Sequence, residues 1–476
     1  MRIKTMNHVD KERNNNVKST ISQCVAILGA CFLQVGIGTE MMSPTIIIGT
    51  LVNNTVTDIH DPMYLTMEQA SWFGSLLYLC TPLGSILSSL SLSRLGHKKC
   101  MLLTNIPYLA ALVMFYYSRN IATLYACSII MGLSMGYAGG PSTSYITEVC
   151  EPKLRGSLTS AQNVFFYLGS LLTSAIYAYT KDWRLTLILT SVIPIINTAL
   201  LLMTPDSPVW LLTRDKSEKA RRMLRKLRGW APRENCESEF QEMIVYTSVD
   251  YDDKDDNDNQ TISTWKLLKQ PNVLRPFRLL IFYFIFANTL SSVQYNPYLV
   301  QVLTKFGAPV NIEWTITFSV MLSISGGILT IFTVHISGKR LLTLVTLMVS
   351  SLCYILVGSI GMFNPMMEPT KSWIVMILFL ISIFSASYGI VPLGWVLLGE
   401  LFPLQTRHIT CSTCASLSYL ITFVLTKFYP DFESAVGFYN GFIIFGTTGL
   451  LGCVYFYMYL PETENKTLQE IEESFK

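Results

Sequence analysis

The sequence predicts an all-α membrane protein in which twelve transmembrane helices form two six-helix halves. Half of the 476 residues are hydrophobic and only 14% are charged, whereas soluble domains carry about 25% charged residues. Buried helices of a soluble protein would need charged faces between their apolar stripes, and this chain lacks the charge to form them. The division into halves follows from charged motifs that occur twice along the chain.

Apolar stretches long enough to cross a bilayer, which takes about 20 residues, recur along the whole chain. The predicted spans are 21–48, 72–92, 101–118, 121–147, 158–179, 185–203, 277–303, 312–334, 341–362, 373–398, 409–426 and 436–460. They predict a cytoplasmic N-terminal arm at 1–20, a six-helix bundle at 21–204, a cytoplasmic linker at 205–275, a second six-helix bundle at 276–460 and a cytoplasmic tail at 461–476.

Lys and Arg are concentrated in alternate connections between these spans, and such residues mark cytoplasmic loops. The N-terminal arm and the even-numbered connections hold them, whereas residues 45–70 contain none. Both termini are therefore expected in the cytoplasm, with the protein in the plasma membrane. Asn53 begins the acceptor sequence Asn53-Asn54-Thr55, falls outside the cell in this arrangement, and is a candidate glycosylation site.

Three charged motifs repeat in the same order at the cytoplasmic ends of equivalent spans. RLGHKK (94–99) matches SGKRLL (337–342), Glu148 and Arg155 match Glu400 and Arg407, and PDSPVWLL (205–212) matches PETENKTL (461–468). The two halves are therefore predicted to be parallel copies, as in transporters of the major facilitator fold.

The repeated acid and base predict a cytoplasmic gate, because a charge near lipid is costly unless it is paired or hydrated. Ion pairs between neighbouring helices would hold the outward-open state and break when the protein opens inward. The predicted gate residues are Arg94, Lys98, Glu148, Arg155, Lys339, Arg340, Glu400 and Arg407. The alternative is that these charges serve membrane topology alone.

The linker is predicted to contain short helices. Residues 213–229 read as a basic amphipathic helix that stops at Gly229, and residues 234–246 as a second, acidic helix. The acidic run at 249–260 has the composition of a segment without regular structure.

Motifs of chemical turnover are missing from the sequence. It has no phosphate-binding G-x-x-x-x-G-K-[ST] and no H-E-x-x-H, and its five histidines are scattered. Most of the eleven cysteines lie in apolar spans and are expected to be packing residues. We expect no enzyme activity, no cofactor, no metal site, no nucleic-acid partner and no obligate protein partner. The expected partners are the lipid bilayer and a small neutral solute.

Polar residues inside the spans predict the solute site. Amides and hydroxyls both donate and accept hydrogen bonds, which suits a neutral polyhydroxyl ligand, and Trp395 and Tyr298 can stack on a sugar ring. No cationic residue occurs deep in a predicted span, which disfavours an anionic solute. The alternative role of the polar groups is helix–helix hydrogen bonding, worth about 0.6 kcal/mol each. Gly132, Gly136, Gly139 and Gly140 are expected to permit close helix packing.

Taken together, the motifs resemble the sugar porter branch of the major facilitator superfamily, particularly insect facilitated trehalose and hexose transporters. The matching residues are RLGHKK, YITEVCEPKLRGS (145–157), Trp183-Arg184, PDSPVWLL, SGKRLL, WVLLGELFPLQTR (395–407) and PETENKTLQEI (461–471). The resemblance implies facilitated transport of trehalose or a hexose by alternating access. It also implies a substrate site made of Asn163, Asn288, Thr289, Gln294, Tyr298, Ser323, Trp395, Ser418 and Thr422.

The implied site departs from the family pattern. Among its residues, only Tyr298 and Trp395 are identical to that pattern. The other positions hold mostly shorter polar groups, which would leave room for a larger ligand such as a disaccharide, or weaken hexose binding. Proton symporters of the family carry an aspartate where this chain has Gly38, and Glu40 follows two residues later. Glu40 is thus a candidate for proton coupling, although facilitated diffusion is favoured. The same residues are also compatible with a sugar sensor that does not transport and with a polyol transporter of the same fold.

Overall fold

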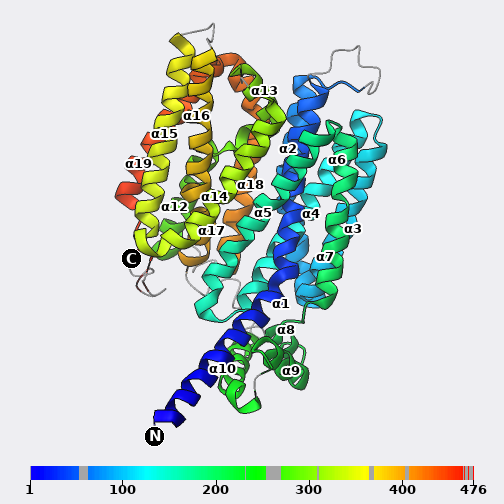
Figure 1. Ribbon diagram of the computed structural model, residues 1–476, viewed down its shortest axis with the longest axis vertical. Helices are drawn as coiled ribbons and strands as arrows, with labels where there is room; N and C mark the ends of the chain where they lie inside the picture. The colour runs from blue at the N-terminus through cyan, green and yellow to red at the C-terminus, as the bar shows by residue number, and fades with distance from the viewer. Residues whose placement is uncertain are drawn as a thin grey trace.

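The structure is a computed structural model that describes residues 2–52, 63–230, 232–252, 270–307, 310–363, 369–402, 407–464, 466, 470 and 475. Over these residues it is helical, with two bundles side by side and a small helical module at one end (Figure 1). We call the end of the bundles that carries this module the linker end, and the opposite end the far end.

The N-terminal half occupies one bundle and the C-terminal half the other. The N-terminal half contains α1 (Arg2–Leu51), α2 (Met67–Leu95), α3 (His97–Tyr117), α4 (Ile121–Val149), α5 (Pro152–Thr180), α6 (Trp183–Thr190) and α7 (Val192–Met203). The C-terminal half contains α12 (Pro271–Leu290), η1 (Ser292–Tyr298), α13 (Leu299–Lys305), α14 (Ile312–Ser337), α15 (Lys339–Phe363), α16 (Pro369–Ser385), η2 (Ala386–Ile390), α17 (Val391–Glu400), α18 (Arg407–Val436) and α19 (Phe438–Tyr459). Because α1 begins at Arg2, the predicted arm 1–20 continues into the first span as one helix.

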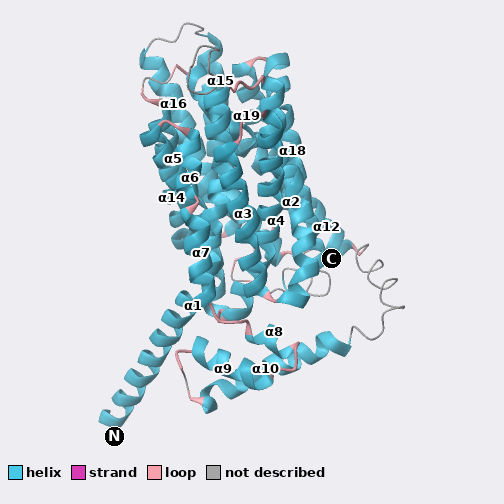
Figure 2. Ribbon diagram, turned by 90° about the vertical axis from the view of Figure 1, so that its right-hand side faces the viewer, coloured by secondary structure: helices cyan, strands magenta, loops and turns pink. Residues whose placement is uncertain are grey.

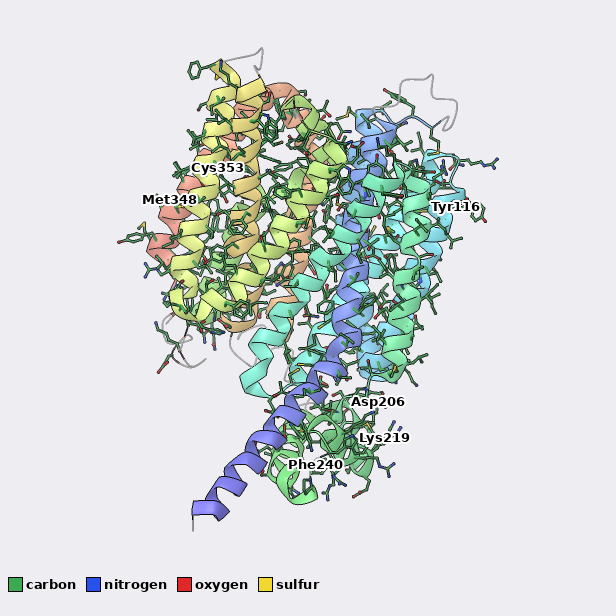
Figure 3. All side chains as sticks on the ribbon, viewed as in Figure 1. Tyr116, Asp206, Lys219, Phe240, Met348 and Cys353 are labelled. Atoms are coloured by element: carbon green, nitrogen blue, oxygen red, sulfur yellow. The ribbon has the colours of Figure 1, made fainter. Side chains whose placement is uncertain are left out.

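Eleven helices among the described residues are long and apolar enough to cross a membrane, with α6 and α7 counted together as Trp183–Met203. They correspond to eleven of the twelve predicted spans. The remaining segment, 158–179, is also helical as part of α5, but its run of Ser, Thr, Gln and Asn keeps it out of that set, so a twelfth span stays a prediction. Large apolar side chains cover the outside of both halves; Figure 3 shows Met348 and Tyr116 projecting there, as lipid-facing residues would.

Two predicted spans are broken helices. Span 277–303 divides into α12, the 3₁₀ turn η1 and α13. The Gln294 amide donates to the Thr289 carbonyl at 2.7 Å across this break. Span 373–398 contains the π-turn η2 just before Pro392, which has no N–H to donate to Tyr388; Thr330 Oγ1 donates to that carbonyl instead. Sequence patterns showed the apolar length of these spans but not where neighbouring helices would satisfy a broken backbone.

The eleventh span is longer than predicted. The prediction ended at Thr426, before a lysine, but α18 continues to Val436. Lys427 therefore lies within the helix and is only 8% exposed. The end of the apolar run therefore did not mark the end of the helix, which continues through a buried lysine.

The linker forms a module across the linker end (Figure 2). It contains α8 (Pro208–Leu212), α9 (Ser217–Leu227) and α10 (Arg233–Asp252). The helices α9 and α10 overlap the two predicted linker helices, and Gly229 follows α9 with φ +69°; the cytoplasmic placement of the linker stays a prediction. A separate small core that includes Leu224 and Phe240 holds the three helices together; Figure 3 labels Phe240 and the ion pair of Lys219 with Asp206, whose Nζ–Oδ2 distance is 2.8 Å. Most of the acidic run, from residue 253 on, lies outside the described residues.

Glycines bring the backbones of α2 and α4 into direct contact, as predicted for Gly132 and Gly136. A Cβ on Gly136 would lie 1.9 Å from the Thr81 carbonyl oxygen, and one on Gly132 would lie 2.4 Å from that of Leu77. The prediction was wrong for Gly139, where a Cβ would meet nothing within 4 Å. Sequence spacing identified the helix but not which of its faces touches α2.

This difference gives a matched pair of variants on one helix. Gly136→Ala should destabilise the protein by about 3 kcal/mol, the upper range for overpacking, because the opposing atom is backbone and cannot rotate away. Gly139→Ala should be neutral or slightly stabilising, since alanine favours a helix by about 0.5–1 kcal/mol over glycine. Melting temperatures of both variants in detergent test this; equal destabilisation would contradict the close α2–α4 contact.

Candidate functional site

The two halves meet along α2 and α18, along α5 and α14, and where α1 approaches η1 and α13. Hydrogen bonds join the halves at the far end. Thr45 Oγ1 on α1 donates to the Asn296 carbonyl at 2.8 Å, and Gln301 Nε2 donates to the Ile48 carbonyl at 3.3 Å. A Cβ on Gly49 would lie 2.4 Å from Val300, so the far end is tightly closed in this structure.

Trp395 lies between helices that border the seam between the halves. Its ring centroid is 5.4 Å from that of Phe284 on α12 and 5.8 Å from that of Tyr419 on α18. The side chain is nevertheless 36% exposed. An exposed aromatic face held by two other rings is a suitable surface for stacking a ligand.

The predicted hydroxyl residues are buried on α12, α14 and α18, of which α12 and α18 contact each other. Thr289, Ser323 and Thr422 donate to carbonyl oxygens of their own helices at 2.8, 3.1 and 2.9 Å. Ser418 is buried one turn before Thr422 on α18. A hydroxyl that donates to its own backbone keeps its lone pairs, so these groups can accept hydrogen bonds from a ligand.

Two amides supply donors near the seam. Asn288 Nδ2 on α12 has no hydrogen-bond partner, and neither does Gln162 Nε2 on α5. The sequence predicted Asn288 but named Asn163, which is half-buried, instead of its neighbour Gln162. Gln162 is only 7% exposed and its Oε1 accepts from Thr143 at 3.5 Å. The adjacent amides in the sequence were the only available signal, and helix rotation decides between them.

Gln294 and Tyr298 have structural partners at the far end. The Gln294 amide bridges the α12–η1 break. The Tyr298 hydroxyl donates to the Thr426 carbonyl at 3.1 Å, and its ring stacks on Tyr429 with centroids 5.5 Å apart. Tyr298 therefore fastens η1 to α18 in the closed far end, and its hydroxyl is engaged there and not by the other predicted substrate-site residues.

Three of the predicted gate residues, Glu148, Lys339 and Glu400, belong to charged networks at the linker end, one network in each half. In the C-terminal half, Lys339 Nζ donates to both oxygens of Glu400 at 2.7 and 2.8 Å and lies 3.0 Å from Glu464. Thr463 Oγ1 also donates to Glu400 at 3.0 Å. Lys339 is only 7% exposed, so these carboxylates, and not water, stabilise its charged ammonium.

The N-terminal half repeats this arrangement with different residues. His97 Nε2 lies 3.2 Å from Glu148 Oε1, at an angle that makes no hydrogen bond, and Ser207 donates to the other carboxylate oxygen. His97 and Lys339 both follow a glycine of nearly equal backbone geometry, Gly96 with φ +79° and Gly338 with φ +75°. The contacts described for both acids lie within one half, whereas the side chains of Arg155 and Arg407, their predicted partners, lie outside the described residues.

The other predicted gate residues bind backbone carbonyls or face outward at the same end. Lys98 Nζ donates to Leu202 O at 2.7 Å, and Arg340 Nη2 donates to Tyr457 O at 2.5 Å. Arg94 is exposed in the last turn of α2. Lys98 and Arg340 thus tie neighbouring helices within their halves.

The Glu464 network makes stability depend on pH. Burial would raise the pKa of Glu464, but hydrogen bonds with His335 and Lys339 outweigh it and lower the pKa below the ordinary value. A lowered pKa in the folded state means that the stabilisation is present above the unfolded-state pKa and is lost as pH falls through the folded-state pKa. We expect the melting temperature to fall less steeply in acid for Glu464→Gln than for the wild type; equal slopes would contradict a stabilising carboxylate.

Glu40 lies inside the N-terminal half. It is 2% exposed and borders a cavity of about 10 Å³ among α1, α3, α4 and α7, which is room for about one water molecule. Glu40 Oε2, Tyr108 OH and Asn197 Oδ1 all border this cavity without a hydrogen-bond partner. The described residues that line it include no Lys, Arg or His. An unpaired carboxylate would be far more costly here than the neutral acid.

Gly38 lies where the backbones of α1 and α5 are in close contact. A Cβ at this position would lie 1.9 Å from the Phe166 carbonyl oxygen on α5, and the Ser170 hydroxyl donates to the Gly38 carbonyl at 3.0 Å. An aspartate side chain therefore has no space at the position where the resemblance places the proton-coupling acid.

The fold and this site define the class: a multi-pass transporter of the major facilitator fold. Two solved structures share the fold, with 18% sequence identity each. A proton:xylose symporter bound to 6-bromo-6-deoxy-D-glucose aligns with TM-score 0.72 over 97% of this chain and 100% of its own. The inward-open xylose transporter from E. coli aligns with TM-score 0.74 over 96% and 100%.

Similar sequences come from insects. The facilitated trehalose transporter of Apis mellifera ligustica is 24% identical over 450 residues, 93% of this chain and 86% of the relative. That of Culex quinquefasciatus is 26% identical over 460 residues, 96% and 86%. Residues 21–475 match the family described as sugar (and other) transporter. The chain belongs to this family of membrane transporters, which are not enzymes.

Proposed function

We propose that the protein carries a neutral sugar, trehalose or a hexose, across the membrane by facilitated diffusion with alternating access. Three observations support this proposal: the exposed Trp395 ring between Phe284 and Tyr419, the unpartnered amide donors of Asn288 and Gln162, and the hydroxyl acceptors on α12, α14 and α18. Aromatic faces and neutral donors and acceptors match the apolar and hydroxyl faces of a sugar. The insect relatives are named for trehalose.

Facilitated diffusion is favoured over proton symport by the surroundings of α1. Gly38 has no space for an acid. Glu40 is enclosed by residues of the N-terminal half alone, so its carboxyl does not border the Trp395 group. Coupling through Glu40 would require a proton path that bypasses the proposed substrate site.

Uptake measurements in oocytes test the function. Radiolabelled trehalose, glucose, fructose and a polyol are compared in cells with verified surface protein. Saturable uptake of at least one sugar, unchanged by an imposed pH gradient and by Glu40→Gln, is expected. Protein at the surface without saturable sugar uptake would contradict transport, and sugar accumulation driven by the pH gradient and lost in Glu40→Gln would replace facilitated diffusion by symport.

We also propose that the linker end faces the cytoplasm at the plasma membrane. Arg94, Lys98, Arg340 and the basic helix α9 lie at this end, as cytoplasmic loops require. Asn53 would then be outside the cell, although it lies beyond the described residues. Glycosidase treatment should increase the gel mobility of the wild type but not of Asn53→Gln; labelling of the N-terminus in intact cells would contradict this orientation.

A further inference from the structure

Lys427 belongs to the C-terminal half, but the groups that bind its ammonium include two from the N-terminal half. Its Nζ donates to Ser71 Oγ on α2 at 2.7 Å and lies 4.7 Å from the centre of the Trp72 ring. The Phe428 ring of its own helix is 5.9 Å away. Lys427 is 8% exposed and Ser71 is 3% exposed, whereas Trp72 is 40% exposed, so the hydrogen bond between Lys427 and Ser71 is buried at the seam between the halves.

The N-terminal half presents a prepared acceptor to this lysine. The Ser71 hydroxyl donates its own proton to the Glu68 carbonyl at 2.8 Å, which directs a lone pair toward the ammonium. The face of a tryptophan ring attracts a cation through its quadrupole, and Trp72 is held 6.4 Å from Phe423 of α18. Among the described residues no carboxylate lies within 4 Å of Lys427 Nζ, so a hydroxyl and aromatic faces are its partners.

The contact lies next to the rest of the far-end closure. Thr426, the residue before Lys427, accepts the hydrogen bond from Tyr298. The other hydrogen bonds described between the halves at this end, from Thr45 and Gln301, are made to backbone carbonyls by neutral groups. Lys427 thus places a charge in a closure whose neighbouring bonds are neutral, at a point where α2 and α18 must separate if the far end opens.

We propose that Lys427, Ser71 and Trp72 form a far-end lock that sets the balance between the two access states. The proposal rests on the alternating access of the proposed function. Closing the far end moves the ammonium from water onto Ser71 and Trp72, and opening returns it to water. Transfer of a charge out of water is costly unless the partner set is complete. Loss of Ser71 or Trp72 as a partner therefore favours the open far end. Loss of the Lys427 charge removes the desolvation cost, and the closed far end then no longer depends on these partners.

Distances between spin labels test the lock without sugar. Labels at Met67 on α2 and Ser434 on α18, both exposed, are placed in a background with the exposed Cys24 replaced by serine. Ser71→Ala should raise the ratio of far-open to far-closed protein about tenfold or more, a factor that corresponds to about 1.4 kcal/mol. In Lys427→Met, which keeps the length of the stem, Ser71→Ala should change the ratio less than about twofold.

Lys305 supplies the matched control. It lies at the same end and pairs with Glu433, but both residues belong to the C-terminal half, so Lys305→Met should leave the ratio unchanged. The lock is overturned if Ser71→Ala acts equally with and without Lys427, if Lys305→Met abolishes the Ser71 effect as Lys427→Met does, or if one distance is found in every variant. If the protein takes up no sugar but the Ser71→Ala effect still depends on Lys427 as expected, the proposed substrate is rejected and the lock remains supported.

Discussion

Trp395→Ala should reduce sugar uptake at subsaturating concentration by about tenfold or more while leaving the protein at the cell surface. Truncation of an aromatic anchor in a binding interface costs about 2 kcal/mol or more, and about 1.4 kcal/mol corresponds to tenfold in affinity. The exposed ring face is available for the ligand, while Phe284 and Tyr419 fix its orientation. Trp395→Phe should retain much of the uptake because it keeps an aromatic face.

Trp373 provides the control for this variant. It is 43% exposed near the start of α16, a similar exposure to that of Trp395, but it lies at the far end, away from the Phe284–Trp395–Tyr419 group. Trp373→Ala should leave the Michaelis constant for uptake unchanged. Equal kinetics for the wild type and Trp395→Ala would remove Trp395 from the substrate site.

Glu400→Ala should destabilise the protein by about 3 kcal/mol, because loss of one partner of a buried ion pair leaves an uncompensated charge. Lys339 would lose two hydrogen bonds of 2.7 and 2.8 Å and keep only Glu464 as a charged partner. We take the lower end of the usual range because the Glu400 side chain is 28% exposed. The melting temperature in detergent measures the effect.

A second substitution separates the charge effect from simple loss of packing. Lys339→Met in the Glu400→Ala background removes the unpaired ammonium and should restore part of the lost melting temperature. Glu433→Gln, which breaks the more exposed pair with Lys305, should cost less than about 1 kcal/mol. If Glu433→Gln were as harmful as Glu400→Ala, burial of Lys339 would not be the cause.

The charged motifs were predictable because they repeat. Glu148 and Glu400 occupy equivalent places and both form networks at the linker end. The residues that lie beside these two glutamates were not predictable from the sequence. His97 and Lys339 reach them because each follows a glycine turn with positive φ. The sequence also suggested Arg155 and Arg407 as partners, and because their side chains lie outside the described residues, that pairing stays a prediction.

In the candidate substrate site, too, the sequence indicated some residues and not others. Trp395 and Tyr298 were identified because they are identical to the family pattern, and Asn288 because an amide within a span is conspicuous. The sequence could not rank Asn163 against Gln162, because a helix turns about 100° per residue and two adjacent amides face different neighbours. Lys427 was missed because the predicted apolar span 409–426 stopped just before this charged residue, although aromatic residues follow it in the sequence.

The sequence alone determined the class of this protein, because apolar length and the placement of charge are properties of the chain as written: eleven of the predicted spans correspond to helices long and apolar enough to cross a membrane. Only the tertiary structure decided which side chains face one another. Helix rotation, the breaks at η1 and η2, and the close glycine contacts set those directions, and they depend on neighbouring helices that no local pattern contains. For that reason the far-end contact of Lys427 and the enclosure of Glu40 became visible only in three dimensions.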